Sequence, residues 1–254
     1  MTDTCILFFV KYPNLGNVKT RLAKVIGEDV ATSLYRHFVL DMLKGFEKIN
    51  SQLRICYAPC GTEDPAKDFR DWLGSQYTYR MQEGENIGQR MKHAMQSAFD
   101  EGFQRVIIVG SDIPDFPPEL ITKAFLDLDM QDAALGPSYD GGYYLIGFRK
   151  DTFFPEVFDN IPWSTRDVYR ATLEKIQNAD LDLVRLPDWN DVDTIWDLNL
   201  LFRTNRNSSF RKSSTYAILR EHSKLIREYD VDLPTSCRLD EDEDTDADKA
   251  VSAC

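Results

Sequence analysis

The chain has 254 residues, 43% hydrophobic and 28% charged, a composition that excludes collagen-like, low-complexity and fully disordered proteins. Its formal net charge is −12, half of it within residues 240–254, so the clustered Lys and Arg of a nucleic-acid-binding protein are missing. No apolar run approaches the roughly 18 residues of a membrane span, and the start of the sequence leads us to expect no secretory signal. Five scattered cysteines predict neither a disulfide framework nor a zinc site, and we expect a reduced, cytoplasmic protein.

Strands and helices are predicted to alternate along the first 200 residues. Residues 5–11 (CILFFVK), with an apolar run from Cys5 to Val10, are typical of a buried strand, and residues 105–110 (RVIIVG) read as a central parallel strand. This alternation predicts an α/β fold: an open, mostly parallel nucleotide-binding sheet with helices on both faces. Further strands are predicted at residues 52–58, 133–136, 143–148 and 181–186, and helices at residues 29–49, 65–73, 87–103, 166–177 and 194–202 and after Pro117.

Composition divides the chain into three parts. Residues 1–203 contain the alternating elements and form the predicted domain. Residues 204–229 are polar and predicted to be a partly helical extension. Residues 230–254 combine many acids with little apolar content, which predicts a disordered tail.

Several common catalytic signatures are absent from the sequence, including G-x-G-x-x-G, the Walker A loop, H-E-x-x-H and G-x-S-x-G. There are only three histidines, and all of them lie in segments predicted to be helical. The chemistry must therefore depend on carboxylates, cations and backbone amides.

The loop after the first strand is the first candidate site. Ligands of open α/β sheets bind beyond the carboxyl ends of the strands. Gly16 permits a tight turn, and Lys11, Lys19 and Arg21 place three cations around the loop, where they suit phosphate groups. The alternative is a solvated basic turn.

Two groups of carboxylates are candidate metal ligands. Asp112 directly follows the buried strand that ends at Gly110, where one or two carboxylates can hold a hard divalent cation. Asp193 or Asp191 is a candidate second ligand. The alternatives are that Asp112 is a turn residue, and that Asp193 or Thr194 caps the following helix.

A third candidate is the segment Gly136 to Tyr144, which contains Asp140, Gly141 and Gly142. Paired glycines let the backbone approach a ligand closely, and flanking tyrosines such as Tyr143 can stack on a ring. Asp-Gly is also a strong signal for a hairpin turn between two strands, and both interpretations can hold.

Five blocks occur in this order: FVKYPNLGNVKTRL, VGSDIPDFP, LGPSYDGGYYLIGF, IPWST and NDVDT. Together they resemble the DUF2064 family of nucleotide-diphospho-sugar transferases, with a glycosyltransferase-A-type fold, over residues 5–202. The chain is more distantly similar to the phospholactate and molybdenum-cofactor guanylyltransferases. The resemblance implies a nucleotide near residues 11–21 and a metal at Asp112, where glycosyltransferase-A proteins carry a D-x-D motif. Here that position reads Ser-Asp-Ile-Pro, which supplies one carboxylate.

We therefore expect a metal-dependent transferase that takes a nucleoside-diphosphate sugar and passes the glycosyl group to an acceptor. Asp140 is the candidate catalytic base. The alternatives are a nucleotidyltransferase that uses a nucleoside triphosphate and releases pyrophosphate, and a nucleotide-binding module without turnover. The remaining assignments are phosphate binding by Lys11, Gly16, Lys19 and Arg21, a sugar or acceptor pocket at Gly141, Gly142 and Tyr143, and Mg²⁺ or Mn²⁺ at Asp112 and Asp193.

Overall fold

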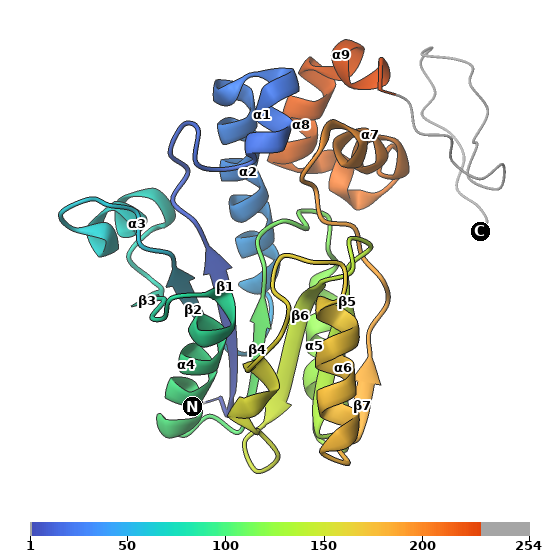
Figure 1. Ribbon diagram of the computed structural model, residues 1–254. Helices are drawn as coiled ribbons and strands as arrows, with labels where there is room; N and C mark the ends of the chain where they lie inside the picture. Colours follow the sequence, from blue (N-terminus) through green and yellow to red (C-terminus); the bar gives the residue numbers. More distant parts are fainter. Residues whose placement is uncertain (1, 230–254) are drawn as a thin grey trace, which may run out of the picture.

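The computed structural model describes residues 2–229, which build a seven-stranded sheet in the order β3-β2-β1-β4-β6-β5-β7 (Figure 1). Only β6 runs antiparallel to its neighbours among these strands, so the predicted α/β fold with a mostly parallel sheet is confirmed. The predicted disordered tail lies outside the described residues. The strands are β1 (Thr4–Val10), β2 (Gln52–Tyr57), β3 (Thr78–Met81), β4 (Arg105–Val109), β5 (Ala133–Pro137), β6 (Tyr143–Arg149) and β7 (Leu183–Arg185).

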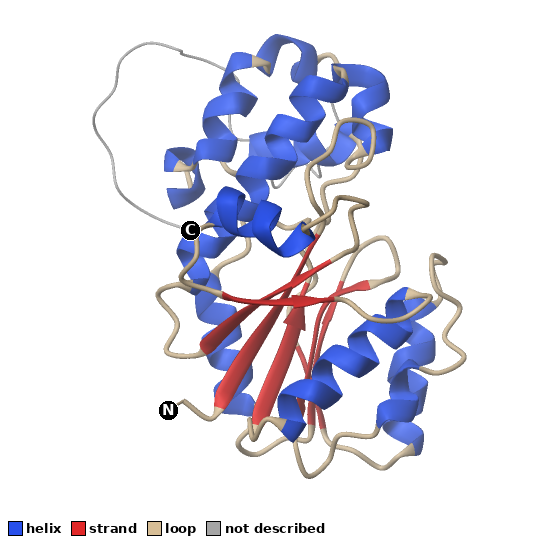
Figure 2. Cartoon of the chain, turned by 90° about the vertical axis from the view of Figure 1, so that its left-hand side faces the viewer, coloured by secondary structure: helices blue, strands red, loops and turns tan. Residues whose placement is uncertain are grey.

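Helices cover both faces of this twisted sheet (Figure 2). All seven residues of β1 are buried, because alternate side chains enter two different cores. Ile6 and Phe8 pack with α2 (Glu28–Phe46) and α5 (Pro118–Asp127). Leu7 packs on the opposite face with α4 (Ile87–Asp100) and α6 (Val168–Asn178). The continuous apolar run in the sequence is thus explained by burial on both sides.

A group of helices lies beyond the carboxyl ends of the strands (Figure 1). It contains α1 (Thr20–Ile26), α7 (Ile195–Thr204), α8 (Ser214–Glu221) and α9 (Ser223–Arg227). Tyr216, Leu219 and Ile226 are buried in the same core as α2, so the polar segment after residue 204 packs on the body of the protein. The remaining helical segments are α3 (Pro65–Leu73), η1 (Pro155–Phe158) and η2 (Ser209–Lys212).

Two elements of the structure were not predicted from the sequence. The segment Thr20–Ile26 forms its own short helix, which a single glycine, Gly27, separates from α2. The strand β3 has only four residues and no fully buried side chain, so it lacks a hydrophobic pattern that sequence reasoning can detect. No helix within residues 2–229 is both long enough and apolar enough to cross a bilayer.

Candidate functional site

Three loops meet at the carboxyl ends of the central strands. The parallel pairing of β1 with β4 sets Phe8 opposite Val109, so the loops that follow these strands begin at the same edge. The Lys11 N–H donates to the Tyr35 hydroxyl (2.9 Å), which in turn lies 2.9 Å from Ser111 Oγ. Tyr35 on α2 therefore holds the two loops together through a buried hydroxyl pair.

The segment before α7 is joined to the same edge by backbone hydrogen bonds. The Val192 N–H donates to the carbonyl of Asp112 (2.9 Å), and the Trp189 N–H donates to the carbonyl of Pro137 (3.1 Å). These bonds place Asp191 and Asp193 beside the end of β4, and the bond between Val192 and Asp112 spans 80 residues of sequence.

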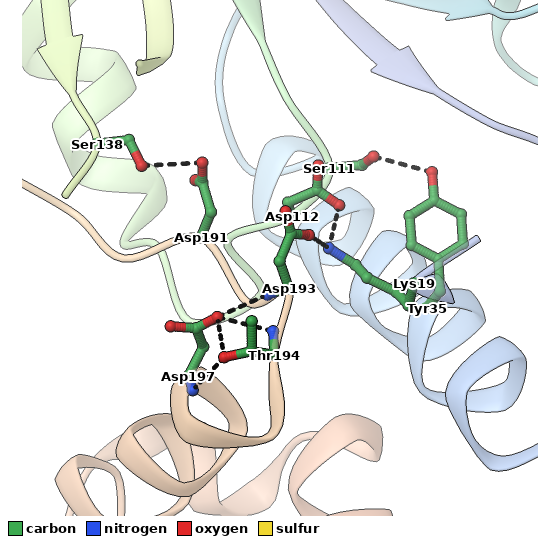
Figure 3. Close-up of polar contacts among 9 residues, drawn as sticks. All are labelled: Lys19, Tyr35, Ser111, Asp112, Ser138, Asp191, Asp193, Thr194 and Asp197. Atoms are coloured by element: carbon green, nitrogen blue, oxygen red, sulfur yellow. Dashed lines mark hydrogen bonds and ion pairs between the residues drawn. The ribbon is translucent and has the colours of Figure 1, made fainter. Parts of the chain in front are cut away.

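Lys19 lies at the centre of the site (Figure 3). Its Nζ is 2.5 Å from Asp112 Oδ1 and 2.8 Å from Asp193 Oδ1. The Lys19 side chain is only 3% exposed, whereas the two carboxylate side chains are 44% and 49% exposed. Burial alone would lower the pKa of Lys19, but the two carboxylates more than offset it, so the pKa is raised and the ammonium stays charged.

Asp193 is positioned by the start of α7. Thr194 is the N-cap, and Asp197 completes a capping box. The Asp197 carboxylate accepts from the backbone N–H of Asp193 (3.1 Å) and of Thr194 (2.7 Å). Of the two capping candidates in the sequence, Thr194 therefore caps the helix, which leaves the Asp193 carboxylate to face Lys19.

Asp191 lies in a different environment, two residues earlier. Its Oδ2 accepts a hydrogen bond from Ser138 Oγ (2.8 Å). Burial, followed by the negative charge of Asp112, raises the pKa of Asp191 to about 7. Burial would also raise the pKa of Asp193, but Lys19 reverses this and holds it below the ordinary value.

Two of the predicted phosphate-binding cations are not paired with a carboxylate among the described residues. The side chains of Lys11 and Arg21 are exposed, and within residues 2–229 neither forms an ion pair. Both lie close enough to Asp193 to help lower its pKa. Gly16, in the same loop, adopts φ +74°, a left-handed conformation that favours glycine. The loop thus presents two free cations beside the Lys19 ion pairs.

The Asp140-Gly141-Gly142 segment forms the turn that joins β5 to β6, which confirms the hairpin interpretation. Gly141 has φ +93°, and a Cβ there would lie 2.3 Å from the carbonyl oxygen of Arg166. Asp140 is exposed, and its Oδ1 accepts from the Gly142 N–H (2.8 Å), as in an Asx turn. The turn is therefore held by its own aspartate and by the loop that contains Arg166.

The tyrosines around this turn have different roles. Tyr143 packs against Trp163, with ring centroids 6.4 Å apart, and its hydroxyl faces the sulfur of Met91. Burial raises its pKa. The Tyr143 ring thus packs in the protein, whereas Tyr139 is 71% exposed beside Asp140. Tyr139 is the tyrosine of this turn that is available to a ligand.

Sequence reasoning assigned no role to Tyr35, or to Ser138 within the candidate segment Gly136 to Tyr144, although both orient the site. Tyr35 lies on the buried face of a helix and reads as an ordinary core residue. Ser138 directly follows β5, and this position at a strand end was the one available signal.

The donor chemistry of the site fits a divalent cation. The carboxylate oxygens of Asp112 and Asp193 converge on one positive charge, and both side chains are open to solvent. Among the described residues, no three His, Cys, Asp or Glu side chains form a metal-binding group. Mg²⁺ commonly takes one or two carboxylates and completes its shell with waters and substrate phosphates, so two carboxylates are sufficient.

The fold, with its site at the carboxyl ends of the strands, is that of an α/β protein of the nucleotide-diphospho-sugar transferase type. A crystal structure from Desulfovibrio desulfuricans, described as a putative nucleotide-diphospho-sugar transferase, is 60% identical, with a TM-score of 0.90. The match covers 91% of this chain and 100% of that chain. The family model DUF2064, described as an uncharacterized protein conserved in bacteria, matches residues 42–165. The chain belongs to this family.

A more distant structure extends the likeness in fold only. A cytidylyltransferase from Leptospira borgpetersenii is 11% identical, with a TM-score of 0.54, and the match covers 91% of this chain and 99% of that one. A comparison with curated proteins gave no match.

Proposed function

We propose that the protein is a metal-dependent transferase that takes a nucleoside-diphosphate sugar and transfers its glycosyl group to an acceptor. One observation carries the proposal. Lys11 and Arg21, which form no ion pair among the described residues, lie at the carboxyl ends of β1 and β4 beside two solvent-open carboxylates, Asp112 and Asp193. A diphosphate needs cations, and a divalent metal needs oxygen ligands. The 60% identical relative supports the donor class.

In this proposal the β1 loop binds the diphosphate. Arg21 offers a planar fork for phosphate oxygens and Lys11 a point charge. Asp112 and Asp193 would hold Mg²⁺ or Mn²⁺, which neutralises charge that develops on the diphosphate leaving group. Because Asp197 fixes the backbone at Asp193, that carboxylate needs little reorganisation when a ligand arrives.

The β5–β6 turn would bind the sugar or the acceptor. Tyr139, which precedes Asp140 and the two glycines in this turn, offers an exposed ring. Asp140 would accept the proton of the acceptor hydroxyl as the new glycosidic bond forms and the bond to the diphosphate breaks. Its Oδ1 holds the turn, so Oδ2 is the oxygen assigned to the proton.

A ligand screen followed by a product assay tests the proposal. Nucleotides and nucleotide sugars are added with and without Mn²⁺, and the melting temperature is measured, because a ligand that binds only the folded state raises it. We expect the largest increase with a nucleotide sugar and Mn²⁺ together, and release of nucleoside diphosphate when an acceptor is supplied. Release of pyrophosphate from a nucleoside triphosphate would instead identify a nucleotidyltransferase. Binding without turnover across an acceptor panel would indicate a nucleotide-binding module.

A further inference from the structure

Lys19 occupies the position between the two carboxylates assigned to the metal. Asp112 Oδ1 and Asp193 Oδ1 both contact its single nitrogen, at 2.5 and 2.8 Å. The Lys19 side chain is almost fully buried, so water screens its charge poorly. In this arrangement the protein neutralises its own carboxylates with an internal cation.

A divalent cation and this ammonium compete for the same oxygens. A metal on Asp112 and Asp193 would lie beside the Lys19 ammonium, and like charges repel strongly where the dielectric is low. Both carboxylate oxygens that a metal would use are already in contact with the Lys19 nitrogen. The ammonium must therefore leave one or both carboxylates before a metal binds well.

An incoming diphosphate offers the displaced ammonium a new partner. Lys11 and Arg21 place the phosphate-binding side of the loop next to Asp193, and the Lys19 side chain starts from the same loop. Transfer of the ammonium from carboxylate to phosphate keeps it paired, which a buried cation requires.

We propose that Lys19 is an internal counter-ion that keeps the Asp112–Asp193 pair occupied until a metal and a diphosphate bind together. This inference rests on the proposed function. It predicts that Lys19 suppresses the binding of metal alone, and that metal and diphosphate strengthen each other's binding by the same factor. A site built in this way does not fill with free metal when no donor is present.

The test is the affinity for Mn²⁺ alone, measured by calorimetry in the wild type and in Lys19→Met. Met fills the buried space of the lysine but carries no charge. We expect Mn²⁺ to bind Lys19→Met at least about tenfold more tightly than the wild type. Lys24→Met removes one positive charge from an exposed position on the same helix and should change the affinity less than about twofold. Lys19→Gln is a second neutral variant, and melting curves identify which variants are folded.

The same titrations with inorganic pyrophosphate measure the coupling. For each protein we take the ratio of the Mn²⁺ affinity with pyrophosphate to that without it, and this ratio should be larger in the wild type than in Lys19→Met. Pyrophosphate also binds Mn²⁺ in solution, but it does so equally in both titrations, so this effect cancels when the two ratios are compared. Unchanged or weaker Mn²⁺ binding in the folded Lys19 variants would overturn the inference while leaving metal-dependent transfer in place. Equal Mn²⁺ affinity of the wild type with and without pyrophosphate would also overturn it. Failure of every protein to bind Mn²⁺, even with pyrophosphate, would remove the proposed metal dependence and this inference with it.

Discussion

Asp191 and Asp193 lie two residues apart on one loop, yet their surroundings shift their pKa values in opposite directions. Burial raises the pKa of Asp191 to about 7, and Asp112 adds to the shift, while its hydrogen-bond donor is the neutral Ser138 hydroxyl. Burial acts on Asp193 in the same sense, but the Lys19 ammonium at 2.8 Å reverses the result. The partner that each side chain reaches therefore decides its charge, and the position along the chain does not.

The largest expected effect comes from Asp112→Asn, which removes a charge that raises the pKa of Asp191 and pairs with Lys19. Asn preserves size but is a weak, neutral ligand, so we expect metal-dependent nucleotide binding to be lost while the fold is retained. Titration of Mn²⁺ with nucleoside diphosphate present measures this. If Asp112 is only a turn residue, Asn should serve as well, and equal metal affinity in the two proteins would refute the assignment.

Arg21→Ala tests whether the cation near Asp193 binds the phosphate groups of a nucleotide. One lost charge-assisted hydrogen bond costs roughly 1.5–3 kcal/mol, so we expect nucleotide affinity to fall about ten- to hundredfold with little loss of stability. Calorimetry on Arg21→Ala and on the control Lys24→Ala, at an exposed position of the same helix, measures the difference. Unchanged affinity in Arg21→Ala would mean that the loop is a solvated turn.

Asp191→Asn should remove a pH dependence of stability. The folded pKa of about 7 exceeds the unfolded value of about 3.9. Between these two values the folded protein keeps a proton that the unfolded chain has lost. The free energy of unfolding should therefore fall as pH rises, by at most about 1.4 kcal/mol per unit, and the slope should end above pH 7.

Urea denaturation of the metal-free protein at several pH values between 4 and 8 measures this slope. The wild type should lose stability across the range more steeply than Asp191→Asn. Asp188→Asn changes an aspartate of the same loop that pairs with Arg185, and it serves as the control. Identical slopes in the wild type and Asp191→Asn would show that folding does not raise the pKa of Asp191.

Ser138→Ala has the smallest expected effect, and it tests how the hydroxyl partner of Asp191 contributes to the difference in pKa between Asp191 and Asp193. The Ser138 hydroxyl stabilises the charged form of Asp191, so its removal should raise the pKa of Asp191 further, by roughly one unit. NMR titration of the Asp191 carboxyl carbon measures the shift. A pKa that moves down or stays constant would mean that this hydrogen bond does not favour the carboxylate.

The architecture was largely predictable, because its strands carry strong local signals. The runs around Phe8 and Ile107 are continuously apolar since both faces of the central strands are covered. The reversed direction of β6 followed from the Asp140-Gly141 hairpin signal. In contrast, β3 pairs with β2 at the sheet edge with partly exposed side chains, so no periodicity marks it.

The sequence singled out several residues of the candidate site but not the contacts between them. Asp112 and Lys19 were found because they follow predicted strands, where ligands bind. The contact of Lys19 with Asp193 spans 174 residues, and that of Ser138 with Asp191 spans 53. Such contacts follow from the order of strands in the sheet, which no local pattern encodes. For the same reason the opposite pKa shifts of Asp191 and Asp193 became visible only in the folded protein.

The strand order has one more consequence. From β1 the chain winds outward through β2 to β3, then returns to place β4 on the other side of β1, so the winding reverses between β1 and β4. The cations of the site, Lys11, Lys19 and Arg21, all precede this return, and the aspartates Asp112, Asp191 and Asp193 all follow it. The part of the chain before β4 thus supplies the positive charges of the site, and the part after it supplies the negative charges. Each half supplies the counter-charge that the other lacks, and the site exists only where they join.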